Sequence, residues 1–373
     1  MCIKRRLKAA CYFLFLLGLT SCVTSSAPHK ERLSMIYSTD MFQPPDDPDD
    51  HYDWAILNML DEIDVKAFIF DLGSSKRDAD EVAVSALKQI SLITGNDIPP
   101  YAIGLRDDIT SIGDQALDQS VIYQKGVDLI LQTLRESKDQ VILFLVGSCR
   151  DFAVAYNRDP ELLKQKVKAL YINAGNGGDD MQGGTGCIQN EWNVTLDPVA
   201  YEILLKSGLP VYWCPCFGNI YQTYYKVDNQ AELLSSCSKK MKNYFAYALN
   251  RAEDDPISYI EGVEREIPET ERHMWCTGPF IHASGRKIYQ DPNGKYIACT
   301  PATAQQKGIS DHEIEVFRFE KVGVTFAPEH TEEGLPIVRL ALNATESNIQ
   351  AFRYVHPEYN QIMTNVLAEM LVE

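Results

Sequence analysis

Between Met35 and Phe217, short apolar runs alternate with amphipathic stretches of helical spacing, and this alternation restricts the fold more than any other feature. The helical stretches cover residues 50–61, 79–94, 120–136 and 197–206, and the apolar runs cover residues 35–37, 65–70, 101–103, 141–146, 169–172 and 209–213. Because residues 141–146 are all apolar, that strand is expected to be buried on both faces. The pattern predicts an α/β fold, with a mostly parallel sheet flanked by helices.

The C-terminal third of the chain has a different pattern. Residues 229–250 predict one long helix, and residues 357–372 predict an amphipathic closing helix. Apolar runs at residues 316–319, 322–326 and 336–342 predict the strands of a small antiparallel appendage. We therefore expect a main α/β domain over residues 34–310. The C-terminal strands and closing helix, over residues 311–373, are expected to pack on it.

The first 21 residues have the features of a bacterial lipoprotein signal peptide. Four basic residues precede an apolar run from Cys11 to Leu19, which continues into Leu19-Thr20-Ser21-Cys22. The run is short for a permanent membrane span, and its ending resembles a lipobox. We expect lipidation at Cys22, a tether over residues 22–33, and a lipid-anchored location in a bacterial cell envelope, on a periplasmic or outer-membrane face. An ordinary secretory signal and a membrane anchor are the alternatives.

The charge of the chain limits its partners. It has 35 lysine and arginine residues against 52 aspartate and glutamate residues, a formal net charge of −17. Such a chain is repelled by nucleic-acid phosphates and by anionic lipid surfaces. We expect small neutral or cationic ligands and no nucleic acid, and the sequence leaves a homo-oligomer open. Seven cysteines follow Cys22, and their odd number and spacing indicate neither a disulfide framework nor a structural zinc site.

An acidic stretch lies between the first predicted strand and the first predicted helix. It reads Asp46-Asp47-Pro48-Asp49-Asp50 and places four carboxylates within five residues. Carboxylates this close repel one another unless a positive charge lies among them, and hard divalent cations prefer oxygen ligands. The alternative is a solvated acidic loop without a ligand. The order strand, acidic loop, helix favours a site, because ligands bind at the carboxyl ends of parallel strands.

Four short motifs occur in an order that resembles the inosine–uridine-type nucleoside hydrolase superfamily. Thr39-Asp40 is followed by Pro48-Asp49-Asp50, and the segment 146–153 follows a central strand. Glu191-Trp192-Asn193 is followed by an Asp-Pro pair at residues 197–198. The resemblance extends over about residues 36–289. It implies the α/β fold of that superfamily and hydrolysis of N-glycosidic bonds in ribonucleosides or related ribosides, a role in purine or pyrimidine salvage.

The resemblance also implies a metal site. Asp40 and Asp50 would bind a calcium ion together with the backbone carbonyl of Arg150, and Asp49 would be the base that takes a proton from water. N-ribosidic cleavage passes through an oxocarbenium-like transition state, which negative charge near the sugar stabilises. Calcium can lower the pKa of a bound water and hold ribose hydroxyls.

Other residues are implied to bind the substrate. Glu191 and Asn193 would contact ribose hydroxyls, although helix capping is their alternative role. Asp71 and Asn173 follow predicted strands, so their side chains are expected at the same edge of the sheet. Trp275 is a candidate for stacking on a base, with packing under the sheet as its alternative.

The sequence departs from the superfamily at several positions. Cys276, within the segment 274–278, replaces an aspartate of the metal site, and a thiol suits calcium poorly. Asp46, Asp47 and Asp53 are candidate replacements. Arg150 replaces a threonine, and Thr185 stands where an asparagine contacts ribose. The glycine-rich stretch over residues 175–190 predicts a lid or rim loop.

Two histidines are candidates for the acid that protonates a leaving group. They are His282 and His51, and a structural role is the alternative for each. Two functions follow from the sequence as a whole: a calcium-dependent N-glycosyl hydrolase, or a non-catalytic lipoprotein that binds sugars or nucleosides and has lost the full metal site. A hydrolase of other glycosides is a third.

Overall fold

The computed structural model describes residues 32–73, 77, 79–177, 191–330, 336–342, 344 and 346–372. The signal peptide, Cys22, most of the tether, Thr185 and residues 178–190 of the glycine-rich stretch lie outside the described residues. Within the described part, no helix is long and apolar enough to span a bilayer.

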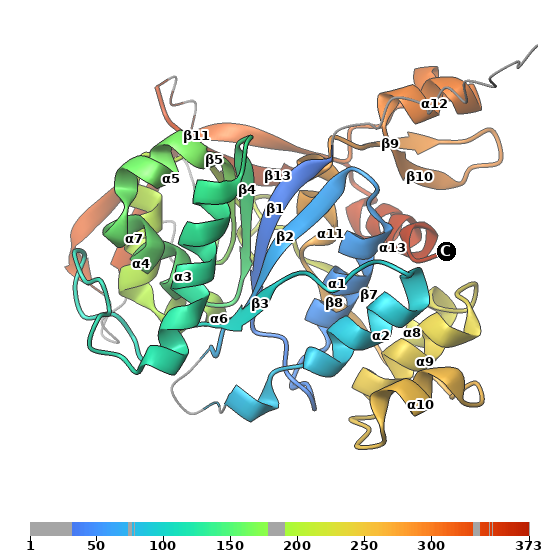
Figure 1. The fold of residues 1–373 in the computed structure, drawn as a ribbon. Helices are drawn as coiled ribbons and strands as arrows, with labels where there is room; N and C mark the ends of the chain where they lie inside the picture. Colours follow the sequence, from blue (N-terminus) through green and yellow to red (C-terminus); the bar gives the residue numbers. More distant parts are fainter. Residues whose placement is uncertain are drawn as a thin grey trace, which may run out of the picture. The chain divides into compact units, whose positions relative to one another are not determined.

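One nine-stranded sheet organises the described chain (Figure 1). Its order is β12-β11-β13-β6-β5-β4-β1-β2-β3; the seven strands from β13 to β3 are parallel to one another, whereas β11 is antiparallel to both β13 and β12. The bounds are β1 Leu33–Thr39, β2 Ile63–Phe70, β3 Tyr101–Ile103, β4 Val141–Val146, β5 Val167–Asn173, β6 Val211–Trp213, β11 Phe317–His330, β12 Pro336–Leu342 and β13 Ile349–Tyr354. The predicted mostly parallel sheet is therefore confirmed.

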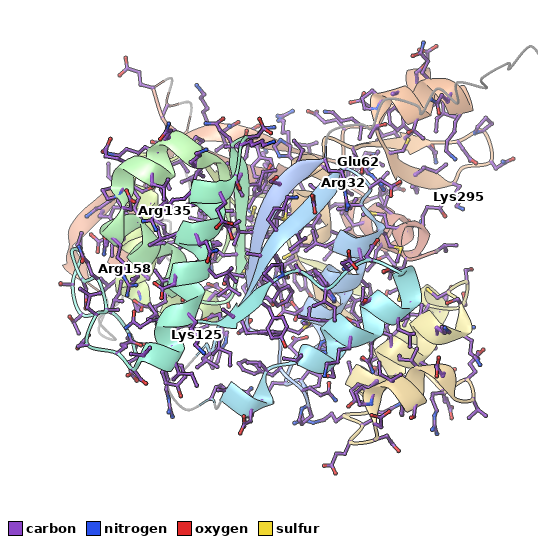
Figure 2. The ribbon with its side chains drawn as sticks, viewed as in Figure 1. Arg32, Glu62, Lys125, Arg135, Arg158 and Lys295 are labelled. Atoms are coloured by element: carbon purple, nitrogen blue, oxygen red, sulfur yellow. The ribbon has the colours of Figure 1, made fainter. Side chains whose placement is uncertain are left out.

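Helices cover both faces of this sheet (Figure 1). In β4, Ile142 and Phe144 join one apolar cluster, whereas Leu143 and Leu145 join the other, which explains its uninterrupted apolar run. The first cluster includes α1 Asp49–Met59, α2 Val84–Thr94, α9 Lys239–Leu249, α10 Pro256–Glu261, α11 Thr277–Ala283 and α13 Tyr359–Met370. The second includes α3 Val121–Glu136, α4 Arg150–Arg158, α5 Pro160–Lys166 and α7 Pro198–Lys206. Charged side chains such as Arg135 and Lys295 lie on the outside (Figure 2).

The remaining elements are short. Two antiparallel pairs, β7–β8 and β9–β10, stand apart from the main sheet. The bounds are β7 Tyr225–Val227, β8 Arg272–Met274, β9 Lys287–Gln290, β10 Tyr296–Cys299, α6 Trp192–Leu196, α8 Gln230–Leu233, α12 Pro301–Lys307, η1 Ala79–Glu81 and η2 Ser310–His312.

Three predicted elements differ from the structure. The long helix predicted over residues 229–250 is divided into α8 and α9, because the Ser238 side chain accepts a hydrogen bond from Met241 N and starts a new helix there. The helix predicted from Ala79 begins at Val84, after a 3₁₀ turn. The C-terminal antiparallel strands are joined to the main sheet by β13, which the sequence analysis did not detect.

Gly104, which follows β3, is required by close packing. A Cβ atom there would lie 2.7 Å from the Asp151 carboxyl carbon, and Asp151 accepts a hydrogen bond from Leu105 N at 3.1 Å. We expect Gly104→Ala to lower the free energy of unfolding by about 1–3 kcal/mol, because the crowded groups must move. Gly113→Ala is the matched control, since nothing lies within 4 Å of a Cβ atom at that position. Urea unfolding of both variants measures the difference; equal stabilities would contradict the packing argument.

Candidate functional site

A cavity of about 370 Å³ lies at the carboxyl ends of the central strands. Asp40 follows β1, Val146 ends β4 and Asn173 ends β5, so three neighbouring strands contribute to it. This is where open α/β sheets bind ligands, and the volume suits a small molecule. The lining consists of Asp40, Phe42, Asp46, Asp47, Asp49, Asp50, Gly73, Arg77, Val146, Asn173, Glu191, Trp192, Asn193, Leu196, Cys216, Phe217 and Trp275.

Three aspartates form the acidic part of the lining. Asp40 leaves β1, whereas Asp49 and Asp50 lie in the first turn of α1, where the helix dipole favours negative charge. The Asp40 and Asp50 carboxyl groups are hydrogen-bonding neighbours, and Asp50 Oδ1 has no partner within the described residues. Two carboxylates in such contact need either a shared proton or a cation.

Burial and mutual repulsion disfavour the ionised forms of these groups. Burial raises the pKa of Asp40 to about 7, and the negative charge of Asp71 adds to the effect. Burial also raises the pKa of Asp49 and Asp50, together with the charges of the neighbouring aspartates. Among the described residues, no three histidine, cysteine, aspartate or glutamate side chains are already gathered as metal ligands. The oxygen donors and the unpartnered Asp50 Oδ1 nevertheless fit a hard cation chemically.

These shifts predict how the stability of the metal-free protein depends on pH. Burial raises the pKa of Asp53 and of Asp151 to about 7 as well. A carboxyl group with a raised pKa holds its proton in the folded state, so its favourable contribution is complete below its ordinary value of 3.8 and is lost as pH rises through about 7. In chelator, we expect stability to fall between pH 4 and 8, by up to about 1.4 kcal/mol per pH unit for each such group.

Calcium should reverse this trend, because a cation binds the ionised carboxylates and its stabilising effect therefore grows with pH. Thermal unfolding in buffers from pH 4 to 8, with chelator or with calcium, tests both statements. Burial lowers the pKa of His51 to about 3 and that of His282 to about 4, so these two residues add stability only as pH rises to their ordinary value of 6.5. A metal-free protein that became more stable above pH 6.5 would contradict the raised pKa values of the buried carboxyl groups.

A second set of cavity residues lies around the end of β5, far from the aspartates in the sequence. The Glu191 carboxylate accepts hydrogen bonds from Gly175 N at 2.7 Å, Asn193 N at 3.1 Å and Val194 N at 3.0 Å. Glu191 therefore caps α6 while it lines the cavity. The Asn193 amide donates to the carbonyl of Asn173 at 2.9 Å, which fixes these two residues relative to each other.

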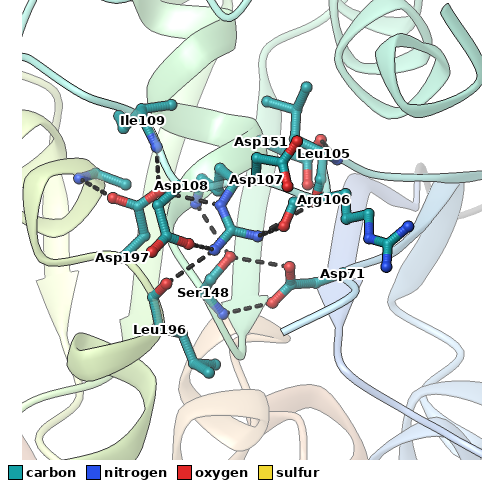
Figure 3. A network of polar contacts seen from close by, with 12 residues as sticks. Asp71, Leu105, Arg106, Asp107, Asp108, Ile109, Ser148, Asp151, Leu196 and Asp197 are labelled. Atoms are coloured by element: carbon teal, nitrogen blue, oxygen red, sulfur yellow. Dashed lines mark hydrogen bonds and ion pairs between the residues drawn. The ribbon is translucent and has the colours of Figure 1, made fainter. Parts of the chain in front are cut away.

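A fully buried arginine connects the loops around the cavity. The Arg150 guanidinium donates to Asp197 Oδ2 at 3.0 Å and to Asp108 Oδ1 at 2.6 Å. It also donates to the backbone carbonyls of Leu105, Arg106 and Leu196 (Figure 3). A further bond goes to the carbonyl of Gly73. One side chain thus joins the segments after β2, β3 and β4 to the α6–α7 junction.

The same network reaches Asp40 through Asp71. The Asp71 carboxylate accepts from Ser148 N at 2.5 Å and from Ser148 Oγ at 2.9 Å (Figure 3). Burial raises the pKa of Asp71, and the positive charge of Arg150 offsets only part of this effect. A Cβ atom at Gly147 would lie 2.7 Å from Asp71 Oδ2 and 3.2 Å from Asp40 Oδ1, so glycine allows both carboxylates to approach the loop.

Comparison with known protein families matches residues 39–276 to the inosine-uridine preferring nucleoside hydrolases, a match over more than half of the chain. The chain belongs to this family.

Individual members of the nucleoside hydrolase family share low sequence identity with this chain. A pyrimidine-specific ribonucleoside hydrolase, RihA, from Citrobacter koseri is 28% identical over 184 residues, which are 44% of this chain and 57% of the relative. RihA of Escherichia coli O7:K1 is 30% identical over 185 residues, with the same coverage. The chain thus spans little more than half of the length of these relatives. An inosine-uridine preferring nucleoside hydrolase from Bacillus anthracis has a TM-score of 0.45 and 13% identity, over 91% of this chain and 99% of that one.

The structure brings most of the residues implied by the family resemblance into one cavity, and places others outside its lining. Those in the lining are Asp40, Asp49, Asp50, Asn173, Glu191, Asn193 and Trp275. Asp71 and Arg150 are absent from the described lining; their side chains instead form the supporting network. Asp53 is absent from the described lining; it accepts a hydrogen bond from the Tyr37 hydroxyl at 3.4 Å and is hydrogen-bonded to the Cys276 thiol.

The structure does not bring either candidate histidine to the cavity. His282 Nδ1 is hydrogen-bonded to the Tyr171 hydroxyl at 2.8 Å, and its ring packs against Phe319 with centroids 4.4 Å apart. His51 is buried beside Tyr244, with ring centroids 6.0 Å apart. Burial lowers the pKa of His51 to about 3 and that of His282 to about 4, so both rings are neutral. The prediction of His282 as a catalytic acid is not supported, because the aromatic core holds it.

Several lining residues were not predicted. Trp192 and Phe217 are 65% and 42% exposed, unusual for large apolar side chains, and Cys216 lies beside Glu191 and Asn173. Trp192 could have been found from the sequence, since it lies between Glu191 and Asn193. Phe217 carried no comparable signal, because its place depends on the fold of the segment after β6.

Proposed function

We propose that the chain hydrolyses the N-glycosidic bond of ribonucleosides or related ribosides with the help of a bound calcium ion. The observation that carries this proposal is the shared cavity: Asp40, Asp49 and Asp50 line it together with Glu191 and Asn193. Membership of the nucleoside hydrolase family and the similarity to the ribonucleoside hydrolase RihA support the reaction class.

Each of these cavity residues would have its own role in the reaction. Asp40 and Asp50 would hold the cation, which when bound acidifies water and binds ribose hydroxyls. Asp49 would accept the proton of the attacking water, and the surrounding carboxylates would stabilise the positive charge that develops on the sugar ring. Asn193, fixed by its bond to the Asn173 carbonyl, would orient a ribose hydroxyl. The Glu191 carboxylate would accept a hydrogen bond from a ribose hydroxyl. Because Glu191 also caps α6, it would hold Asn193 in position beside the same sugar.

Release of free base tests the proposal. Uridine, cytidine and inosine should be converted to ribose and base in calcium, and conversion should stop in excess chelator and return when calcium is restored. A folded, calcium-loaded protein that converts none of a wide panel of ribosides would overturn it.

One observation favours the alternative of binding without turnover. Cys276 replaces an aspartate of the family motif. Its thiol is hydrogen-bonded to Asp53, and it is absent from the described lining of the cavity. A thermal shift with a nucleoside that neither depends on calcium nor yields product would support a sugar- or nucleoside-binding protein. Product from non-ribosyl glycosides would instead support a hydrolase of another substrate class.

We also propose that Cys22 carries a lipid that holds the chain at a bacterial cell envelope. Expressed with its full N-terminus, the protein should fractionate with membranes, and Cys22→Ala should move it to the soluble fraction. Equal membrane association of the two forms would contradict lipid anchoring at this residue.

A further inference from the structure

The described lining of the cavity carries far more negative than positive charge. Six carboxylates line it, against one basic side chain, Arg77. Arg77 is already engaged, since it forms ion pairs with Asp46 and Glu81. Asp50 is more than nine-tenths buried, and its Oδ1 has no hydrogen-bond partner in the described part of the chain.

Neighbouring charges do not remove this excess. Arg272 lies 2.6 Å from Asp47, and Arg251 lies 3.9 Å from Asp46, both from outside the lining. These arginines pair with Asp46 and Asp47, and no ion pair within the described residues gives Asp40, Asp49, Asp50 or Glu191 a basic partner. A ligand that brings a positive charge is therefore favoured over a neutral or anionic one.

Aromatic side chains supply the rest of the binding surface. Trp192, Phe217 and Trp275 line the cavity, and Trp192 and Phe217 are substantially exposed. The Trp275 indole donates to the Cys216 carbonyl at 3.1 Å and meets Phe217 edge to face, with centroids 5.9 Å apart, so its ring is held in place. Aromatic faces beside carboxylates are the surroundings that bind planar organic cations.

The described part of the lining offers little help to a neutral leaving base. A proton donor speeds the departure of a neutral base, and the described lining contains no histidine, lysine or tyrosine. Burial raises the pKa of the Cys216 thiol, which makes it a poor acid. Asp46 and Asp47 are ion-paired with arginines, and Asp49 has the role of the base.

We propose, on the basis of the hydrolase function above, that the preferred substrates are N-ribosides with a planar cationic aglycone, such as pyridinium ribosides. Their leaving group needs no proton. The C1′–N bond breaks, its electron pair returns to the ring nitrogen, and the aglycone departs as a neutral pyridine. Water forms the new bond to C1′ and gives one proton to Asp49. The cationic substrate and water thus yield ribose, a neutral base and one proton.

Binding to the Asp49→Asn protein tests this preference without interference from turnover. Three ligands are titrated in calcium by calorimetry: a 3-carbamoylpyridinium riboside, the 3-carboxylate analogue of the same shape, and uridine. The carbamoyl compound should bind at least about tenfold more tightly than either other ligand, a difference of roughly 1.4 kcal/mol. Uridine or the carboxylate binding equally well or better would overturn the proposal.

A charge change in the lining provides a second comparison. In the Asp49→Asn background, Asp46→Asn removes one of the two acidic partners of Arg77 and should reduce the preference for the carbamoyl over the carboxylate ligand. Asp118→Asn removes the same charge from an exposed position outside the lining and should leave the preference unchanged. An unchanged preference in Asp46→Asn would contradict the electrostatic explanation.

Turnover by the unmodified protein separates the two proposals. If it hydrolyses uridine while the binding preference is absent, the hydrolase function stands and the cationic preference fails. If it hydrolyses no riboside while the preference for the cation is present, the preference stands for a binding protein and the hydrolase function fails.

Discussion

Asparagine at position 49 is expected to lower riboside turnover by about 10²–10⁴-fold, because the side chain could no longer accept a proton from water. Asp49 lines the cavity beside Asp40 and Asp50, and burial together with neighbouring charges raises its pKa. A base in this setting is ionised at neutral pH only when a cation offsets the surrounding charge. The substitution removes the base and leaves Asp40 and Asp50 in place as cation ligands.

Two measurements distinguish this role from a structural one. Calcium affinity, measured by calorimetry, should change little in Asp49→Asn, and the metal-free variant should be at least as stable as the unmodified protein because one buried carboxyl group is gone. Asp50→Asn is the contrasting variant, since it should lose calcium affinity together with turnover. An Asp49→Asn protein with undiminished turnover would assign the base to another residue.

Replacement of Arg150 by methionine is expected to lower the free energy of unfolding by about 3–5 kcal/mol, because it leaves the buried Asp197 carboxylate without its positively charged partner and removes a donor from several carbonyls. The side chain is fully buried and contacts Asp108, Asp197 and the backbone that follows two strands, β2 and β3. Arg150→Lys should recover only a small part of the loss, since an ammonium group cannot reach all of these acceptors at once.

Arg135→Met is the matched control for this prediction. The Arg135 side chain is 56% exposed and pairs with Asp159 at 3.0 Å. An exposed pair contributes at most about 1 kcal/mol, so this variant should be nearly as stable as the parent. Urea unfolding of the three variants gives the comparison. If Arg150→Met unfolded at the same urea concentration as Arg135→Met, the network would not be what fixes the loops around the cavity.

Local patterns were sufficient to predict the central sheet. The apolar run of β4 and the helical spacing around it depend only on neighbours in the sequence, and the structure confirms both. The joining of the C-terminal strands to β6 through β13 depends on a pairing between residues 211–213 and 349–351, which no local pattern encodes. The division of α8 from α9 needed the capping role of Ser238 to be recognised.

The acidic half of the candidate site could be predicted because its residues are close in sequence and match the family motif. Trp275 lies far from them in sequence, and only the fold shows it beside Phe217. The positions of His282 and Asp53 could not be predicted, because their partners Tyr171 and Cys276 come from distant elements. Nor does the sequence indicate that the Arg150 side chain would connect the loops around the cavity, since the family resemblance concerns only its backbone carbonyl.

The central claim is that a hard cation binds among the carboxylates at the start of α1, beneath a riboside. Bound metal in purified protein, dialysed against calcium and measured by atomic emission, tests it most directly, with Asp50→Ala treated in the same way. The expected result is about one calcium ion per chain, retained through gel filtration and lost in Asp50→Ala. The contradictory result is a folded protein without bound calcium, or the same calcium content in Asp50→Ala.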